Sequence, residues 1–320
     1  MASPSPIVEQ LRLTGLVPVI ALKDASDAEP LARALLEGGL PCAEVTFRTS
    51  AAPEAIRRIA KAFPEMFLGA GTVLSVDQVK EALDCGACYI VSPGLNRKVV
   101  EYCVGKSVAV TPGVATPSDL ELALELGLKV VKFFPAEANG GLAYLKALSG
   151  PYGNVRFIPT GGIDESNLLQ YLKFPRTLAC GGSWMVKPDF IAAKQFDKIR
   201  DLTARAVQLM LGLNLEKLVF AAKENASGLA GVLSNLMLQP PRDGNSSLQV
   251  GSQFEVLKQQ ENAPRDMVLI GTHFPDRALY FLGRRGVQAR EGGEFVLADG
   301  VEGVKLDLDL GGLAVGLVPR

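Results

Sequence analysis

Short apolar runs alternate with amphipathic stretches from Leu16 to Gly181. The apolar runs are rich in Val, Ile and Phe and short enough for buried strands, and the stretches between them have helical spacing. Eight successive strand–helix repeats favour a (β/α)8 TIM barrel over an open doubly wound sheet, which rarely needs eight evenly spaced units. The apolar runs are Leu16–Leu22, Cys42–Phe47, Phe67–Gly71, Cys88–Ser92, Val108–Thr111, Lys129–Phe134, Val155–Thr160 and Thr177–Gly181. The helical patterns include Ile7–Leu13, Ala28–Glu37, Ala52–Ala62, Val76–Leu83, Ser118–Leu126, Ser166–Leu172 and Phe190–Leu213.

The pattern changes after Leu213. Residues 214–238 have a helical pattern, and residues 239–257 are rich in Pro, Gly, Asn, Ser and Gln, which predicts a linker. The remainder contains an apolar strand, a helix and further strands, which is the order of a small α+β module. We therefore predict a barrel domain over residues 1–213, a helix and linker over 214–257, and a small module over 258–320.

Composition narrows the class of protein. Hydrophobic residues make up 48% and charged residues 21%, and the net charge of −1 gives no electrostatic attraction for nucleic acid. No run of apolar residues is long enough to cross a membrane, and the start of the chain lacks the pattern of a secretory signal. We expect a cytoplasmic enzyme with a small-molecule substrate.

The cysteines and the single histidine limit metal and redox chemistry. Cys85 and Cys88 form a C-x-x-C pair, but no second pair follows it. Buried small residues are therefore expected there rather than a redox or zinc site. His273 is the only histidine, so no mechanism in the first 200 residues uses imidazole. No metal or cofactor is expected.

Lys132 is a candidate nucleophile because it lies in the middle of an apolar run. Alternation along a strand places it on one face with Val130 and Phe134. If that face is the barrel interior, desolvation lowers the pKa of the amine and makes it available for imine formation. The alternative is a lysine that extends outward at the end of its strand.

A second run brings three polar side chains onto one strand face. Glu44, Thr46 and Arg48 alternate with apolar residues in the segment 42–48. Polar groups facing a barrel interior are costly unless they are paired or functional. Glu44 suits a general acid/base and Arg48 suits a carboxylate anchor. The alternative is a structural ion pair between the two.

Glycine-rich turns follow the seventh and eighth predicted strands. In barrels this corner commonly holds a phosphate, because glycine lets backbone N–H groups approach the anion. Glycines also serve simple turns, but here two pairs occur at the two expected strand ends. Two further turns contain Thr72, which either bonds a carboxylate or only shapes its turn, and Pro93. The candidate phosphate site consists of Thr160, Gly161, Gly162, Gly182 and Ser183.

Two long segments, 39–48 and 127–140, resemble the signature segments of the KDPG/KHG aldolase family. The resemblance covers about residues 5–213. It implies a class I, Schiff-base aldolase that cleaves 2-dehydro-3-deoxy-6-phosphogluconate, often with 4-hydroxy-2-oxoglutarate aldolase activity. It also implies a homotrimer of barrels without a metal.

The resemblance also implies roles for individual residues. Lys132 matches the imine-forming lysine and Glu44 the general acid/base. The pyruvyl pocket is matched by Arg48, Thr72, Pro93 and Phe134, and the phosphate cradle by the glycine turns. Some relatives carry an arginine after the first strand that assists the phosphate. Here Lys23 is the only nearby cation, and a lysine supplies a point charge without a bidentate fork.

The C-terminal tail resembles, more faintly, a glyoxalase-like βαβββ module. Such modules often bind metal through His and Glu, but beyond His273 the last strand offers no ligand. Asp307 and Asp309 suit a solvated strand face. A packing or oligomer-stabilising role is expected for this module.

Three alternative functions are consistent with these features. The same chemistry can act on 4-hydroxy-2-oxoglutarate or on 2-dehydro-3-deoxy-6-phosphogalactonate, and the sequence does not reveal the stereochemical preference at C4. A phosphate-binding isomerase or epimerase would need no covalent lysine. A sugar-phosphate sensor would need neither Glu44 nor Lys132.

Overall fold

The expected apolar runs form a parallel barrel in the computed structural model, which describes residues 5–222, 225–258, 266–297 and 299–320. The first residues of the chain, on which the expectation of an unprocessed start partly rests, lie outside the described ranges. The chain divides into two units, Met1–Met210 and Leu211–Arg320. This division lies close to the expected boundary near Leu213.

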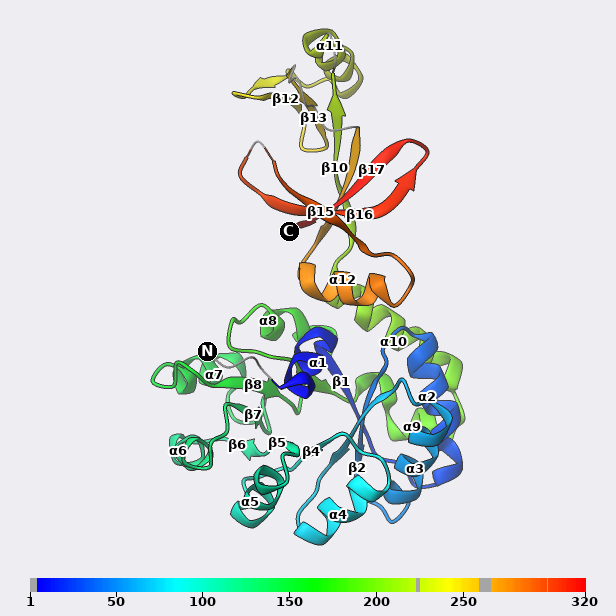
Figure 1. Ribbon diagram of the computed structural model, residues 1–320, viewed down its shortest axis with the longest axis vertical. Helices are drawn as coiled ribbons and strands as arrows, with labels where there is room; N and C mark the ends of the chain where they lie inside the picture. The colour runs from blue at the N-terminus through cyan, green and yellow to red at the C-terminus, as the bar shows by residue number, and fades with distance from the viewer. Residues whose placement is uncertain (1–4, 223–224, 259–265, 298) are drawn as a thin grey trace. The chain divides into compact units, whose positions relative to one another are not determined.

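The barrel closes through parallel strand pairs and isolated bridges (Figure 1). One sheet has the order β5-β4-β3-β2-β1-β9 and the other β6-β7-β8, and a bridge from Thr160 to Gly181 joins β8 to β9. Pro112, which has no N–H to donate, separates β5 from β6, so two short strands fill the place of one. The strands are β1 (Leu16–Ile20), β2 (Cys42–Thr46), β3 (Phe67–Gly71), β4 (Tyr89–Val91), β5 (Ala109–Thr111), β6 (Gly113–Val114), β7 (Val130–Phe133), β8 (Arg156–Pro159) and β9 (Cys180–Gly182).

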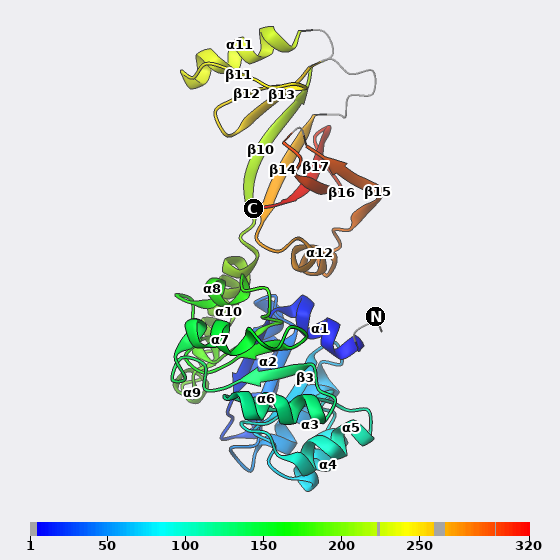
Figure 2. The ribbon, with the colours of Figure 1, turned by 90° about the vertical axis from the view of Figure 1, so that its left-hand side faces the viewer.

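The helices surround these strands (Figures 1 and 2). Several begin at side chains that accept a backbone N–H, as Ser75, Asn96 and Thr116 do. The expected helix 190–213 is interrupted at Lys194, whose positive φ of 54° is incompatible with an α-helix. The helices are α1 (Pro6–Thr14), α2 (Ala28–Glu37), α3 (Ala52–Ala62), α4 (Val76–Asp84), α5 (Arg97–Gly105), α6 (Pro117–Glu125), α7 (Gly141–Ser149), α8 (Leu168–Leu172), α9 (Pro188–Ala192) and α10 (Phe196–Leu211), with 3-10 turns at Ala25–Asp27 and Trp184–Val186.

The C-terminal unit corrects two predictions. Residues 214–221, expected to be helical, form strand β10 (Asn214–Ala221), because β13 and β14 pair with its two edges. Residues 239–257, expected to be a linker, contain three strands, and the apolar side chains of two of them, β12 and β13, pack beneath α11. Tertiary pairing overrides local propensity in both segments. The elements are α11 (Ala226–Met237), β11 (Arg242–Asp243), β12 (Ser247–Val250), β13 (Phe254–Leu257), β14 (Met267–Thr272), α12 (Pro275–Gly283), β15 (Ala289–Val296), β16 (Glu302–Leu310) and β17 (Leu313–Pro319).

This unit is built as an internal repeat. Strand, helix and three strands occur twice, first from β10 to β13 and then from β14 to β17. The sheet order β11-β12-β13-β10-β14-β17-β16-β15 is symmetric about the antiparallel β10–β14 pair. The first and last strands of each half are parallel. The expected single module over 258–320 is therefore only the second half of the unit, and the glyoxalase-like resemblance remains a prediction.

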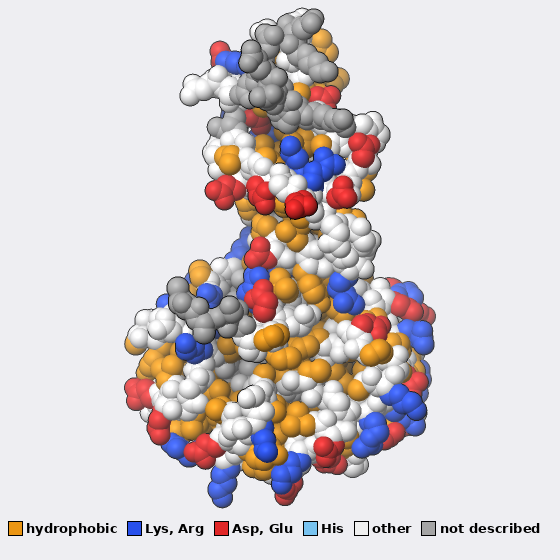
Figure 3. Space-filling model, in the orientation of Figure 1, with side chains coloured by type: hydrophobic (Ala, Val, Ile, Leu, Met, Phe, Trp, Pro, Cys, Tyr) orange, Lys and Arg blue, Asp and Glu red, His pale blue; other side chains and the backbone are white. Residues whose placement is uncertain are grey.

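A buried ion pair links two strands of this sheet, β10 and β13. Glu255 is 1% exposed, and its carboxylate accepts hydrogen bonds from Lys217 and Ser247, each at 2.8 Å. Asp307 and Asp309 lie on an exposed stretch of β16. On the face shown in Figure 3, charged side chains of both signs are interspersed over the described residues. No helix within the described ranges has the length and apolar character needed to cross a bilayer.

The packing around Gly69 predicts that one added methyl group destabilises the barrel. A Cβ added to Gly69 would lie 2.2 Å from Cζ of Tyr89, a ring that is 1% exposed. We expect Gly69→Ala to lower the free energy of unfolding by about 1–3 kcal/mol. Urea unfolding followed by the fluorescence of Trp184, the single tryptophan, reports on the barrel.

Gly105→Ala is the matched control, because no heavy atom lies within 4 Å of the added Cβ. It should change the free energy of unfolding by less than about 1 kcal/mol. Equal effects of the two substitutions would contradict the proposed steric conflict with Tyr89.

Candidate active site

Lys132 and Glu44 meet inside the barrel. Lys132 lies on β7 and Glu44 on β2, and their side chains are 5% and 4% exposed. The Nζ of Lys132 is 3.5 Å from Oε1 of Glu44. The strand alternation expected from the sequence therefore directs both side chains inward. The alternatives of an outward lysine and of an ion pair between Glu44 and Arg48 do not describe this arrangement.

A glycine makes room for the Glu44 carboxylate. Gly71 lies opposite Thr46 in the β2–β3 register, two residues beyond the level of Glu44. A Cβ at Gly71 would lie 2.2 Å from Oε1 of Glu44 and 2.8 Å from its Cδ. The space that a side chain would fill on β3 is thus occupied by the carboxylate. Gly71 has a positional role beside the candidate acid/base that the sequence alone does not reveal.

Two buried neighbours of Glu44, Cys42 and Tyr89, are uncharged. Burial raises the pKa of the Cys42 thiol to about 12. Burial, followed by the neighbouring Cys42 and Glu44, raises the pKa of the Tyr89 phenol well above its usual range. Both side chains are therefore neutral at pH 7. Thr46 is also buried, and its hydroxyl donates to the carbonyl of Ile20 at 2.7 Å.

An aromatic ring lies beside the amine. The Nζ of Lys132 is 5.1 Å from the ring centroid of Phe134, within the range of a cation–π interaction. Phe134 and Pro93 are both partly exposed, as expected for walls of a pocket. The carbonyl of Pro93 approaches Gly113, which directly precedes Val114 on β6 next to β7.

Arg48 and Thr72 meet at the ends of β2 and β3. The Nε of Arg48 donates to Oγ1 of Thr72 at 3.3 Å, and Arg48 is exposed. Thr72 has a φ of 56°, a left-handed conformation that is rare for a β-branched residue. Backbone strain of this kind concentrates at functional sites. The pair presents a guanidinium and a hydroxyl at the same edge of the barrel, a suitable arrangement for a carboxylate.

The two glycine turns lie at adjacent strand ends. The Thr160–Gly181 bridge places Gly161 and Gly162 beside Gly182. Gly161 and Gly162 have φ values of 98° and 81°, so this turn needs residues without a Cβ. Ser183 is exposed at the end of β9, as an anion ligand requires. Thr160 differs from this expectation, because it is buried and its hydroxyl donates to the carbonyl of Ile158 at 3.3 Å.

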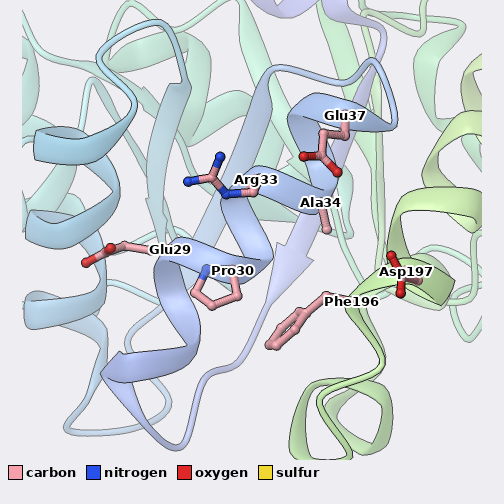
Figure 4. Close-up of a pocket in the computed structure, with 7 residues that line it drawn as sticks. All are labelled: Glu29, Pro30, Arg33, Ala34, Glu37, Phe196 and Asp197. Carbon is pink, nitrogen blue, oxygen red and sulfur yellow. The ribbon is translucent and has the colours of Figure 1, made fainter.

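Hollows of the barrel unit include two that lie away from the Lys132–Glu44 pair. A groove of about 300 Å³ between α2 and the start of α10 is drawn in Figure 4, and none of the candidate catalytic residues lines it. A cavity of about 620 Å³ lies under α1, where Leu11, Tyr89 and Val130 contribute to its lining. These hollows do not contain the Lys132–Glu44 pair. The candidate site is defined by its side chains rather than by either hollow.

The cysteines are free thiols. Cys85 is buried and Cys88 is exposed, and both are free. A guanidinium nitrogen of Arg57 lies 3.2 Å from the sulfur of Cys85. In the part of the chain that the structure describes, no three His, Cys, Asp or Glu side chains gather closely enough to hold a metal ion. In the C-terminal unit, the ring of His273 packs edge-on against Phe274.

One contact network near the glycine turn is not apparent from the sequence. The Glu137 carboxylate accepts a hydrogen bond from the hydroxyl of Tyr171, which is 1% exposed on α8. Glu137 lies within the segment 127–140 that carries the family resemblance, but Tyr171 is part of an ordinary apolar helix pattern. Only the folded chain brings the two residues together.

The arrangement is suited to covalent chemistry on a carbonyl compound. A buried amine is able to form an imine, and a carboxylate at 3.5 Å is able to move protons at the adjacent atoms. The candidate carboxylate anchor lies at the ends of β2 and β3, and the candidate anion-binding turns lie at the ends of β8 and β9. The substrate expected for such a site is a small keto acid with a second anionic group.

Known proteins with similar sequences agree in the family that they indicate. A family model described as KDPG and KHG aldolase matches residues 7–202. A 2-dehydro-3-deoxy-phosphogluconate aldolase of Treponema pallidum is 50% identical over 204 residues, which cover 64% of this chain and 97% of that protein. The KHG/KDPG aldolase of Escherichia coli K12 is 45% identical over 201 residues, covering 62% of this chain and 94% of that protein.

Solved structures agree with this result. The KDPG aldolase of Legionella pneumophila, with pyruvate captured as a covalent carbinolamine intermediate, is 37% identical with a TM-score of 0.61 and covers 63% of this chain and 98% of that one. The enzyme of Zymomonas mobilis ZM4 with 3-phosphoglycerate is 43% identical with a TM-score of 0.58, covering 63% and 94%. Residues beyond the matched region form a C-terminal extension that these relatives do not span.

Thiol titration tests the packing beneath Glu44. Burial raises the pKa of Cys42 to about 12 and that of Cys103 to about 11, so both remain protonated at pH 8, and the thiolate is the reactive form. We expect Ellman's reagent to modify the exposed Cys88 of the native protein rapidly and to leave Cys42 and Cys103 unmodified until the protein is unfolded.

Cys88→Ser should remove the rapid phase of the reaction. Rapid modification of Cys42 in the native protein would show that the environment beneath Glu44 is open to solvent, which contradicts the structure.

Proposed function

This chain belongs to the KDPG and KHG aldolase family, and we propose that it cleaves 2-dehydro-3-deoxy-6-phosphogluconate to pyruvate and glyceraldehyde 3-phosphate through an imine on Lys132. It is an aldolase, a lyase that breaks carbon–carbon bonds. The observation that carries the assignment of residues is the Lys132–Glu44 contact at 3.5 Å inside the barrel. The relatives named for this activity match over nearly their full length.

The reaction begins at the Lys132 amine. Transfer of a proton from the ammonium to the neighbouring carboxylate leaves a neutral amine, which adds to the C2 carbonyl of the keto acid. Glu44 returns that proton to the departing hydroxyl, so that loss of water gives a protonated imine and restores the Glu44 carboxylate. Because both side chains are buried, an ammonium on Lys132 is poorly stabilised unless a negatively charged group lies beside it. Glu44 supplies that partner and also takes part in the next steps.

Cleavage of the C3–C4 bond follows from the imine. The bonding electrons move into the protonated imine and produce an enamine, while the C4 hydroxyl proton passes to the Glu44 carboxylate and the aldehyde leaves. Glu44 then returns a proton to C3 of the enamine, and water hydrolyses the resulting pyruvate imine. A positioned acid/base of this kind contributes about 10²–10⁴ in rate.

Arg48 and Thr72 anchor the substrate at its carboxylate end. Their contact at 3.3 Å gathers a charged donor and a hydroxyl at the ends of β2 and β3. Pro93 and Phe134 form walls of the pyruvyl pocket. An anchored carboxylate fixes the rotation of the substrate, so that the C3–C4 bond lies across the π system of the imine.

The glycine turns receive the phosphate. Gly161, Gly162, Gly182 and Ser183 lie at the adjacent ends of β8 and β9, whereas the buried Thr160 supports the turn from below. This corner favours a phosphorylated substrate over 4-hydroxy-2-oxoglutarate. One solved relative, which is 37% identical with a TM-score of 0.55, is named for both activities, so cleavage of the smaller keto acid is the second candidate function.

The assembly and location of the protein are also proposals. Homotrimer formation is supported by apolar side chains that are partly exposed on the barrel unit, among them Leu74 at 54% and Val104 at 48%. A cytoplasmic location is supported by the five free thiols, since reducing compartments preserve them.

Substitution of the lysine tests the proposed function. We expect Lys132→Ala to reduce cleavage to the background of the assay, because no other group forms the imine. Pyruvate release coupled to lactate dehydrogenase measures the rate. Lys129→Ala, at an exposed position next to the same strand, should retain the wild-type rate. Equal rates for the two variants would refute the role of Lys132.

Substitution of the carboxylate tests the proton transfers. Glu44→Gln keeps the shape of the side chain but removes its ability to accept a proton, so kcat should fall about 10²–10⁴-fold. Glu54→Gln, at an exposed carboxylate of α3, is the control and should have the wild-type kcat. Normal turnover by Glu44→Gln would mean that another group moves the protons.

A further inference from the structure

The loop that follows the Lys132 strand is bonded directly to the glycine turn after β8. The N–H of Ala136 donates to the carbonyl of Thr160 at 2.8 Å, and the N–H of Glu137 donates to the carbonyl of Gly161 at 3.0 Å. In return, the N–H of Thr160 donates to the carbonyl of Phe133 at 3.0 Å. The backbone carrying the nucleophile and the backbone of the turn therefore form one continuous ladder beyond the regular strands.

The Glu137 side chain lies against this turn. A Cβ at Gly162 would be 2.5 Å from Cγ and 2.6 Å from Cβ of Glu137. On its other side the turn is held by Asn167, whose side-chain amide donates to the carbonyl of Gly162 at 2.9 Å and whose side-chain oxygen accepts from the N–H of Asp164 at 2.9 Å. The conformation of the turn thus depends on contacts from both directions.

The carboxylate of Glu137 is held by a buried phenol. The Tyr171 hydroxyl donates to its Oε1, and Tyr171 is 1% exposed on α8, the helix that follows the turn. A Cβ at Gly141 would lie 3.1 Å from the same Oε1, so this oxygen lies beside the first residue of α7. The amino end of a helix favours a negative charge. Both contacts keep the carboxylate charge beside α7 and α8.

We infer that Glu137 and Tyr171 are positioning residues that hold the Gly161–Gly162 turn in the shape and place needed for the substrate phosphate. They join α8 and the glycine turn to the strand that carries Lys132. They do not touch the reacting atoms in the proposed mechanism. The inference rests on the proposed function, because it assumes that the turn receives the phosphate of the substrate that Lys132 attacks.

If Tyr171 holds the glycine turn in place, removal of its hydroxyl should weaken phosphate binding selectively. Tyr171→Phe removes the hydroxyl but keeps the ring, so the turn loses one anchoring contact. We expect the Kd for inorganic phosphate, measured by isothermal titration calorimetry, to rise about tenfold, which is the scale of one hydrogen bond to a charged group. The KM for 2-dehydro-3-deoxy-6-phosphogluconate should rise by a similar factor while kcat changes less than about twofold.

A reaction of the same lysine without phosphate separates this role from a general structural one. Exchange of the methyl protons of pyruvate with D₂O requires the imine on Lys132 but no phosphate contact. Tyr171→Phe should perform this exchange within about twofold of the wild-type rate. If the exchange and the phosphate-dependent reaction fall by the same factor, Tyr171 supports the whole barrel, and the positioning role is wrong.

Two further variants complete the test. Tyr152→Phe is the matched control, since it removes another tyrosine hydroxyl that donates to a glutamate, Glu121 at 3.2 Å, and it should leave both readouts unchanged. Glu137→Gln still accepts the Tyr171 hydrogen bond and should restore most of the phosphate affinity that Glu137→Ala loses. Because Glu137 is exposed, Glu137→Ala provides the test if Tyr171→Phe does not fold.

The outcomes for the two proposals are distinct. Wild-type protein that binds phosphate but neither cleaves the substrate nor exchanges pyruvate would refute the proposed function and leave the phosphate-binding effect of Tyr171 intact. Active wild-type protein whose Tyr171→Phe and Glu137→Ala variants both bind phosphate as tightly as wild type would overturn the positioning role.

Discussion

A lysine and a glutamate that share one buried space inside the barrel are the interaction on which this site depends. The Nζ–Oε1 distance is 3.5 Å, and both side chains are almost completely removed from water. Isolated burial of either charge is costly, so each residue requires the other. The surroundings suit this pair. Gly71 leaves space for the carboxylate. Cys42 and Tyr89 stay uncharged at neutral pH, so they add no further charge beside it.

The remaining parts of the site extend this pair toward the two ends of a substrate. Arg48 and Thr72 meet at one group of strand ends, and the glycine turns meet at another. Glu137 joins the second group to the strand of Lys132 through backbone and side-chain contacts. In the proposed mechanism, contacts at both ends of a phosphorylated keto acid orient its C2 atom toward the amine. We therefore expect the affinity for this substrate to depend on how these loops are joined.

Much of this arrangement follows from local patterns in the sequence. Eight apolar runs predicted the barrel, and alternation along two strands predicted that Glu44 and Lys132 face inward. Contacts between distant segments were not predictable. The Glu137–Tyr171 bond depends on how the loop after β7 meets α8, and residues 214–221 form a strand only because β13 and β14 pair with it. The pattern predicts the second half of the C-terminal repeat and helix α11 of the first half, but not the strands on either side of α11.

Reductive trapping of the protein with pyruvate tests the central claim most directly. Borohydride added in the presence of pyruvate should reduce the imine and leave a stable adduct of one pyruvyl group, and peptide mass spectrometry should place it on Lys132. The same treatment without pyruvate should leave the mass unchanged. Unlabelled protein, or a label that persists in the Lys132→Ala variant, would contradict the claim that this buried amine bonds covalently to the keto acid.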